Sequence, residues 1–118
     1  MKISKQELPV TLESDAMVIQ EVVWGNMHVG YETYKEHTDL GPLLKGLPDN
    51  SCQSSHWGYV IKGRMVIKYK DIEEIITAGD FYYLTPGHIA VMDAGTEIME
   101  FSPNDEYSKT MEVVEKNL

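Results

Sequence analysis

The chain has 118 residues, the size of one typical domain and enough to bury a substantial hydrophobic core. Its net charge of −9 opposes phosphate backbones, and no apolar run approaches the roughly 20 residues that span a bilayer, so we expect neither a nucleic-acid partner nor membrane insertion. A single cysteine, Cys52, excludes an internal disulfide and suits a reducing compartment. Since the amino terminus lacks a secretory signal, we expect a cytoplasmic protein.

In chain order, the first predicted elements are two strands over residues 17–24 and 27–36. Gly25 and Asn26 separate them, and such a pair tolerates the positive φ that a tight hairpin requires. Residues 38–51 follow, rich in glycine, proline, asparagine and aspartate, and predict a long loop. Four leucines within this loop indicate that it packs down on the protein.

The next region shows regular turn punctuation, with turn residues eight positions apart at Gly63, Asp71, Gly79, Gly87 and Gly95. The strand candidates around these turns are 54–61, 64–70, 74–77, 81–84, 88–93 and 97–101. Within 64–70, apolar residues occupy the odd positions from Met65 onward, which is the period-2 pattern of a half-buried strand. Such spacing is typical of a sandwich or small barrel. We therefore predict one all-β domain over residues 1–118.

The tail, residues 104–118, is open to two interpretations. Tyr107, Met111 and Val114 have the spacing of one face of a short helix. Glu112, Val113 and Val114 would equally suit an edge strand.

Two stretches of this β-rich frame resemble the two motifs of the cupin superfamily. The first is His56-Trp57-Gly58-Tyr59-Val60-Ile61-Lys62-Gly63, and the second is Gly79-Asp80-Phe81-Tyr82-Tyr83-Leu84-Thr85-Pro86-Gly87-His88. The resemblance covers about residues 50–103 and extends to a subgroup of small cupins of mostly unassigned function. It implies a double-stranded β-helix, or jelly-roll barrel.

The ligand positions of metal-binding cupins are only partly matched. Such cupins carry two histidines and a glutamate in the first motif and one more histidine after the second. By spacing, these positions fall on Asn50, Cys52, His56 and Ala90. The three-histidine, one-glutamate cage that the family usually carries is therefore absent.

His56, His88 and Cys52 are the candidate metal ligands that remain. In the barrel that the resemblance implies, His88 shares its strand face with Ala90, so both imidazoles are expected to point inward. Two imidazoles and a thiolate suit zinc and accept iron or nickel. A further donor would come from His28 or from Glu97 or Glu100. The alternative is a polar pocket without metal, in which inward histidines bond to tyrosines or carboxylates.

These observations leave three functions open. The barrel would bind a small polar or anionic metabolite, with or without one divalent metal. Alternatively, it would be a metal-dependent enzyme of the dioxygenase, isomerase or decarboxylase type, or a structural barrel without a site. The resemblance also implies a homodimer, joined through a sheet edge or an exchanged amino-terminal strand. Trp57 alternates away from His56 and is expected to pack against the amino-terminal strands or the 40–47 loop, or else to form a dimer contact or ligand platform.

Overall fold

Short alternating segments and closely spaced turns produce ten strands in the computed structural model, which describes residues 1–118. The strands are β1 (Val10–Glu13), β2 (Met17–Trp24), β3 (Met27–Tyr34), β4 (Thr38–Asp39), β5 (His56–Lys62), β6 (Arg64–Lys68), β7 (Glu73–Thr77), β8 (Phe81–Leu84), β9 (Ile89–Met92) and β10 (Thr96–Pro103). The helices are three 3₁₀ turns, η1 (Lys5–Glu7), η2 (Gly41–Leu44) and η3 (Pro48–Asn50), and one α-helix, α1 (Asn104–Asn117). Helix α1 is neither long nor apolar enough to cross a membrane.

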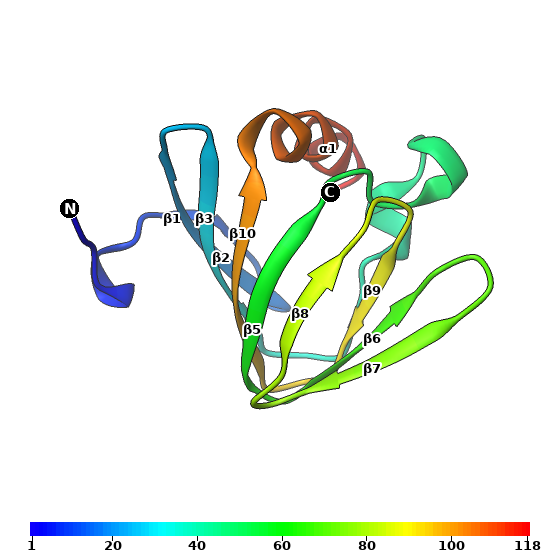
Figure 1. Ribbon diagram of the computed structural model, residues 1–118, viewed down its shortest axis with the longest axis horizontal. Coiled ribbons are helices and arrows are strands. Elements are labelled where there is room, and N and C mark those ends of the chain that lie inside the picture. Colours follow the sequence, from blue (N-terminus) through cyan, green and yellow to red (C-terminus); the bar gives the residue numbers. More distant parts are fainter.

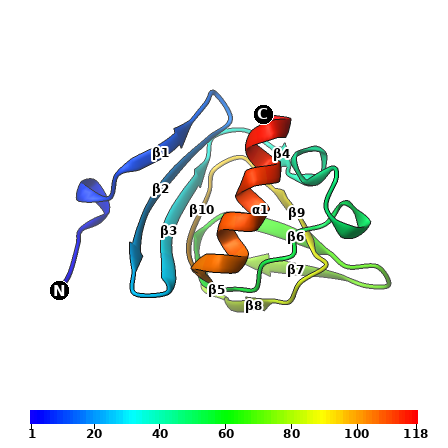
Figure 2. The same cartoon turned by 90° about the horizontal axis from the view of Figure 1, so that it is seen from above.

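The strands form two antiparallel sheets that face each other. The larger has the order β1-β2-β3-β10-β5-β8 and the smaller the order β4-β9-β6-β7. Most consecutive strands from β3 onward lie in different sheets, so the chain winds back and forth between them as in a jelly roll. The sheets converge at the end opposite α1, and α1 lies across the open end of the barrel (Figures 1 and 2). The predicted all-β jelly-roll barrel is confirmed.

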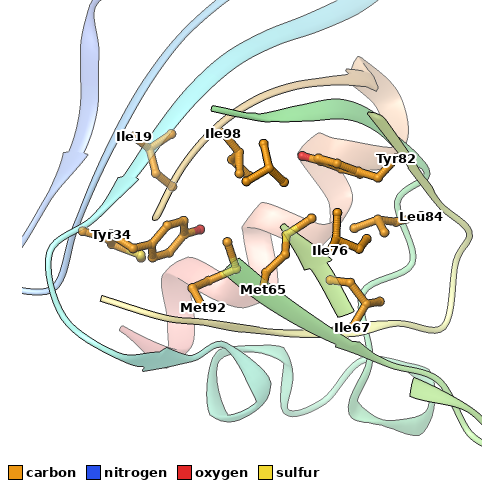
Figure 3. Close-up of a cluster of buried hydrophobic side chains, with 11 residues drawn as sticks. Ile19, Tyr34, Met65, Ile67, Ile76, Tyr82, Leu84, Met92 and Ile98 are labelled. Atoms are coloured by element: carbon orange, nitrogen blue, oxygen red, sulfur yellow. The ribbon is translucent and has the colours of Figure 1, made fainter. Parts of the chain in front are cut away.

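Eleven buried side chains from both sheets fill the barrel (Figure 3). Met65 and Ile67 of β6 are buried whereas Arg64 and Lys68 are exposed, which confirms the alternation seen in the sequence. The chain reverses from β5 to β6 at Gly63, whose φ of +82° is left-handed and therefore favours glycine. Burying these apolar side chains stabilises the fold by about 25 cal/mol per Å² removed from water.

Two tyrosines bring hydroxyl groups into this apolar core. The rings of Tyr34 and Tyr82 enter from opposite sides, and both hydroxyls point toward the middle (Figure 3). Gly58 makes room for the Tyr82 ring, because a Cβ at position 58 would collide with that ring and with the Met99 carbonyl. The ring therefore crosses β5 and reaches β10 beyond it.

The tail is a helix over almost its whole length, which excludes the edge strand. Asp105 and Glu106 lie in its first turn and Lys116 in its last, the charge order that a helix dipole favours. Tyr107 and Val114 are buried on the face toward the barrel. The packing of this face decides between the two interpretations.

Three further details can be compared with the sequence-based expectations. Two short strands, β1 and β4, were not predicted; β1 contains a bulge and β4 has only two residues. The 38–51 loop contains η2 and η3 and buries Leu44, in agreement with the expected packing. The expected packing of Trp57 on the amino-terminal strands or the 40–47 loop is wrong: its ring stacks on Tyr83, with centroids 5.0 Å apart, and remains 44% exposed.

Candidate metal centre

A cavity of about 100 Å³ lies inside the open end of the barrel, beneath α1. Both sheets, the loop before β5 and the inner face of α1 line it. Its lining is mostly apolar, with polar groups from Glu32, Cys52, His56, His88 and Glu100. A mostly apolar cavity with a few convergent polar groups is the usual form of a small-molecule site.

The backbone places Cys52 and His88 side by side although 36 positions separate them in the sequence. The Cys52 N–H donates to the His88 carbonyl at 2.8 Å, and the Gly87 N–H donates to the Cys52 carbonyl at 2.7 Å. This isolated bridge continues the pairing of β5 with β8 toward α1. His56 begins β5 and faces inward, so all three side chains meet in the cavity.

The three side chains present their ligand atoms within 4.8 Å of one another, and all three residues are buried. Cys52 Sγ lies 3.4 Å from His56 Nε2, and the two imidazole rings meet edge to face with centroids 5.1 Å apart. Tetrahedral zinc with Zn–N near 2.0 Å and Zn–S near 2.3 Å requires separations of about 3.3–3.7 Å. The Cys52–His56 pair already fits, and a separation at the 4.8 Å limit would have to shorten by about 1.1–1.5 Å.

Hydrogen bonds on the far side of each ring determine which nitrogen is free. His88 Nδ1 lies 2.7 Å from the Thr85 carbonyl oxygen, which can only accept, so this nitrogen carries the proton. His56 Nδ1 lies 2.6 Å from Ser102 Oγ on β10. His88 therefore presents an unprotonated Nε2, and His56 does so in the tautomer whose Nδ1–H donates to Ser102 Oγ, the arrangement that orients histidine ligands in metalloproteins.

Burial keeps the three candidate ligands uncharged. It lowers the pKa of both His56 and His88 to about 4, so both rings are neutral at pH 7. It raises the pKa of the Cys52 thiol to about 12. A metal ion bound here would have to displace the thiol proton, because the thiolate is the ligand form.

A pair of carboxyl groups, Glu32 and Glu100, lines the same cavity from β3 and β10. Tyr34 donates a hydrogen bond to Glu32, and Tyr82 donates one to Glu100 at 2.9 Å. Burial and the neighbouring Glu100 charge raise the pKa of Glu32 to about 8, and burial raises the pKa of Glu100 to about 7. Near neutral pH the pair therefore holds at least one proton. Glu100 Oε2 is also 3.7 Å from His56 Nδ1.

The further ligand candidates, His28 and Glu97, lie elsewhere. The ring of His28 stacks on Tyr107 of α1, and its Nε2 pairs with Glu21 at 2.5 Å. Glu97 faces the outside of the barrel, where it accepts a hydrogen bond from Tyr31 at 2.5 Å. Inward and outward positions alternate along β10, so Glu100 is the carboxylate of this strand that reaches the cavity.

Sequence reasoning missed several residues of the cavity. Glu32 was assigned no role, although the alternating burial of β3 places it on the inward side with Tyr34. Ser102 was not singled out either, yet its Oγ lies 2.6 Å from His56 Nδ1. An acidic residue at an inward position of a predicted strand is the signal that would have identified Glu32.

Comparison with known proteins supports the fold through structure alone. No protein-family model matches the sequence, and no curated protein matches it. Solved structures do match. An RmlC-like cupin from Shewanella frigidimarina is similar with a TM-score of 0.62 at 15% identity, covering 86% of this chain and 88% of that one. The polyketide cyclase RemF from Streptomyces resistomycificus gives 0.63 at 10%, covering 88% and 79%.

A third similar structure is the iron(II) form of HppE, with a TM-score of 0.61 at 10% identity, covering 86% of this chain and 59% of that one. Identities this low establish the fold and not the chemistry. The two antiparallel sheets, the winding of the chain between them and these neighbours lead to one conclusion. This chain has the cupin fold.

Proposed function

We propose that the barrel holds one divalent transition metal at Cys52, His56 and His88 and binds a small polar molecule at that metal. The observation that carries the proposal is the convergence of Cys52, His56 and His88 in the cavity: their ligand atoms lie within 4.8 Å of one another, and a hydrogen bond holds Nδ1 of each ring. Two imidazoles and one thiolate favour zinc, with iron or nickel as alternatives. Three protein ligands leave a coordination position for the small molecule.

The cavity limits what that molecule can be. No lysine or arginine lines it, so an anionic ligand depends on the positive charge of the metal. The cavity, of about 100 Å³, is small, so the ligand is a small molecule. Glu32 and Glu100 share at least one proton and can both donate and accept hydrogen bonds.

A second candidate function, metal-dependent catalysis, rests on the same carboxyl pair. Its raised pKa values lie near neutral pH, where a general acid or base is most effective. A bound metal would supply Lewis acidity. Glu100 would then take up or return a proton beside His56, and the apolar lining would exclude water. The third candidate, a barrel that binds nothing, predicts a protein free of metal.

The test is the metal content after expression in medium supplied with zinc, iron and nickel. We expect about one equivalent in the wild type and less than about a tenth in His56→Ala and His88→Ala, since two remaining ligands hold such ions weakly. His37→Ala is the matched control, because His37 is exposed and lies outside the cavity. A wild type with less than a tenth of an equivalent would contradict the proposal.

A second readout distinguishes binding at this site from adventitious binding. Because the histidines are neutral and the thiol is protonated, binding of one zinc ion at pH 7 is expected to release the thiol proton, and any proton that the Glu32–Glu100 pair loses beside the ion adds to the number. Calorimetry in buffers of different ionisation enthalpy measures this number. Cys52→Ser should release one proton fewer than the wild type, and release that is unchanged in this variant would argue against the Cys52 thiolate.

A further inference from the structure

Thr110 places a hydroxyl group of α1 in the cavity lined by the three candidate ligands. The residue is 4% exposed and lies on the inner face of α1, one turn after Tyr107 and one turn before Val114. Helix α1 itself lies across the open end of the barrel (Figure 2). The Tyr107 hydroxyl is already bound to Glu21, and the other α1 residues that line the cavity, Met111 and Val114, are apolar. Thr110 is therefore the free polar group that α1 offers to the cavity.

The Thr110 hydroxyl has no hydrogen-bond partner. Threonine within a helix can bond to the carbonyl four positions earlier, which here belongs to Glu106, but Thr110 Oγ1 does not. The one other buried side-chain atom without a partner, Nδ1 of His28, belongs to a residue that does not line this cavity. Because most buried polar atoms in proteins are paired, an unpaired hydroxyl inside a cavity points to a partner that the site itself supplies.

Cys52 packs against the same helix. It belongs to a small buried cluster that includes Val114, and Met111 packs against this cluster. Burial raises the pKa of the Cys52 thiol, whereas hydrogen bonding by the Ser54 backbone and by the Thr110 side chain lowers it. Both groups therefore lie beside the sulfur, and Thr110 is the one that a side-chain substitution can remove.

The form of the sulfur determines whether it can accept a hydrogen bond from Thr110. The sulfur of a thiol is a weak acceptor, in agreement with the unpaired hydroxyl. A metal-bound cysteine is a thiolate, and hydrogen bonds to a charged acceptor are shorter and roughly twice as strong as those between neutral groups. Metal binding at Cys52 would therefore create a strong acceptor beside a donor that has none.

We infer that the Thr110 hydroxyl donates a hydrogen bond to the Cys52 thiolate of the metal centre and thereby couples metal binding to the docking of α1 on the barrel. This inference rests on the proposed function, because the metal is what forms the thiolate. Coupling between two equilibria is reciprocal, so a docked helix that strengthens metal binding is itself held in place by the metal, by the same factor. Thr110 is then a positioning residue, and the stability of α1 depends on metal occupancy.

The first test is the zinc affinity of the full-length protein, measured by competition with a chromophoric chelator. Thr110→Val replaces the hydroxyl with a methyl group of similar size and should weaken zinc binding by about tenfold. Thr110→Ser keeps a hydroxyl and should retain most of the affinity. Thr33→Val is the matched control, because alternation along β3 places Thr33 on the outward side, between the inward Glu32 and Tyr34. It should bind zinc as the wild type does.

The stability of the variant without added metal separates this role from a purely structural one. Thr110→Val should then resist urea at least as well as the wild type, because it removes an unpaired buried hydroxyl. A less stable Thr110→Val would mean that the hydroxyl supports the fold and would contradict the inference. Added zinc should slow amide exchange in α1, and by about tenfold less in Thr110→Val than in the wild type. Hydrogen exchange followed by mass spectrometry measures this difference.

Cobalt(II) in place of zinc gives a readout of the sulfur itself. Its thiolate-to-metal charge-transfer band lies at higher energy when a hydrogen bond stabilises the sulfur lone pairs. The band should therefore move to longer wavelength in Thr110→Val and keep its position in Thr110→Ser and Thr33→Val. An unmoved band in Thr110→Val, or zinc affinity equal to that of the wild type, would overturn the inference and leave the proposed function intact. A wild type that takes up no zinc would overturn both.

Discussion

Ser102 is a single hydroxyl that determines how the barrel can use His56. It lies 2.6 Å from His56 Nδ1 and is fully buried, so no water can replace it without rearrangement. Removing such a hydrogen bond commonly lowers metal affinity by about 10- to 100-fold, because the ligand loses its orientation and its tautomer. His88 is oriented by a similar hydrogen bond from its Nδ1. Its acceptor is the backbone carbonyl of Thr85, which no side-chain substitution removes.

We therefore expect Ser102→Ala to weaken zinc binding by about 10- to 100-fold while leaving the number of protons released the same as in the wild type. Competition with a chromophoric chelator measures the affinity. Ser108→Ala, at an exposed position of α1, is the control and should bind as the wild type does. Equal affinities in Ser102→Ala and the wild type would mean that Ser102 does not orient the ligand.

At the scale of one element, α1 closes the open end of the barrel and is tied down near both of its ends. The Ser55 N–H donates to Glu106 at 2.9 Å near the start of the helix. Near its end, the Asn117 amide donates to the carbonyls of Leu43 and Lys45 at 3.0 and 2.8 Å. Helix α1 lines the cavity and lies across the open end of the barrel (Figure 2).

Asn117→Ala should loosen the end of the helix without removing any cavity residue. Losing these hydrogen bonds costs about 1 kcal/mol, which corresponds to roughly fivefold faster amide exchange over the last turns of α1. Hydrogen exchange followed by mass spectrometry measures this, and it does not require a metal. Lys116→Ala, whose side chain is exposed, is the control. Identical exchange in both variants would show that Asn117 does not hold the helix.

At the scale of the whole molecule, the buried carboxyls and histidines together determine how stability depends on pH. Folded Glu32 and Glu100 keep their protons above the ordinary value of 4.5, so rising pH favours the unfolded chain up to about pH 8 and 7 respectively. In the folded chain, His56 and His88 lose their protons near pH 4 and not near the ordinary value of 6.5. Rising pH therefore favours the folded chain between about pH 4 and 6.5. The two effects oppose each other below pH 6.5, and only the carboxyls act above it.

The metal-free protein is therefore expected to lose about 2–3 kcal/mol of unfolding free energy between pH 6.5 and 8, at about 1.4 kcal/mol per pKa unit. Urea denaturation at the two pH values measures the loss. Glu32→Gln should remove most of it, because a glutamine does not ionise. Glu36→Gln, on the exposed surface, should retain it. A wild type equally stable at both values would contradict the raised pKa values.

The sequence by itself determined the fold, because the signals of a small barrel are local. The alternation of Met65 and Ile67 with polar neighbours assigns the faces of a strand, and glycines such as Gly63 mark reversals that a left-handed φ requires. Both depend on neighbouring residues and can be read without coordinates. The resemblance to the cupin motifs in turn implied that His56 and His88 point inward, and both are buried in the structure.

Only the tertiary structure decided which inward side chains meet. The approach of Cys52 to His88, the pairing of Glu32 with Glu100 and the hydrogen bond from Ser102 all join segments far apart in the chain. Periodicity states which face a residue occupies, but the register between strands and the closure of the barrel determine what lies opposite. The tertiary structure also decided that the tail is a helix, because the apolar face of this helix packs against the open end of the barrel.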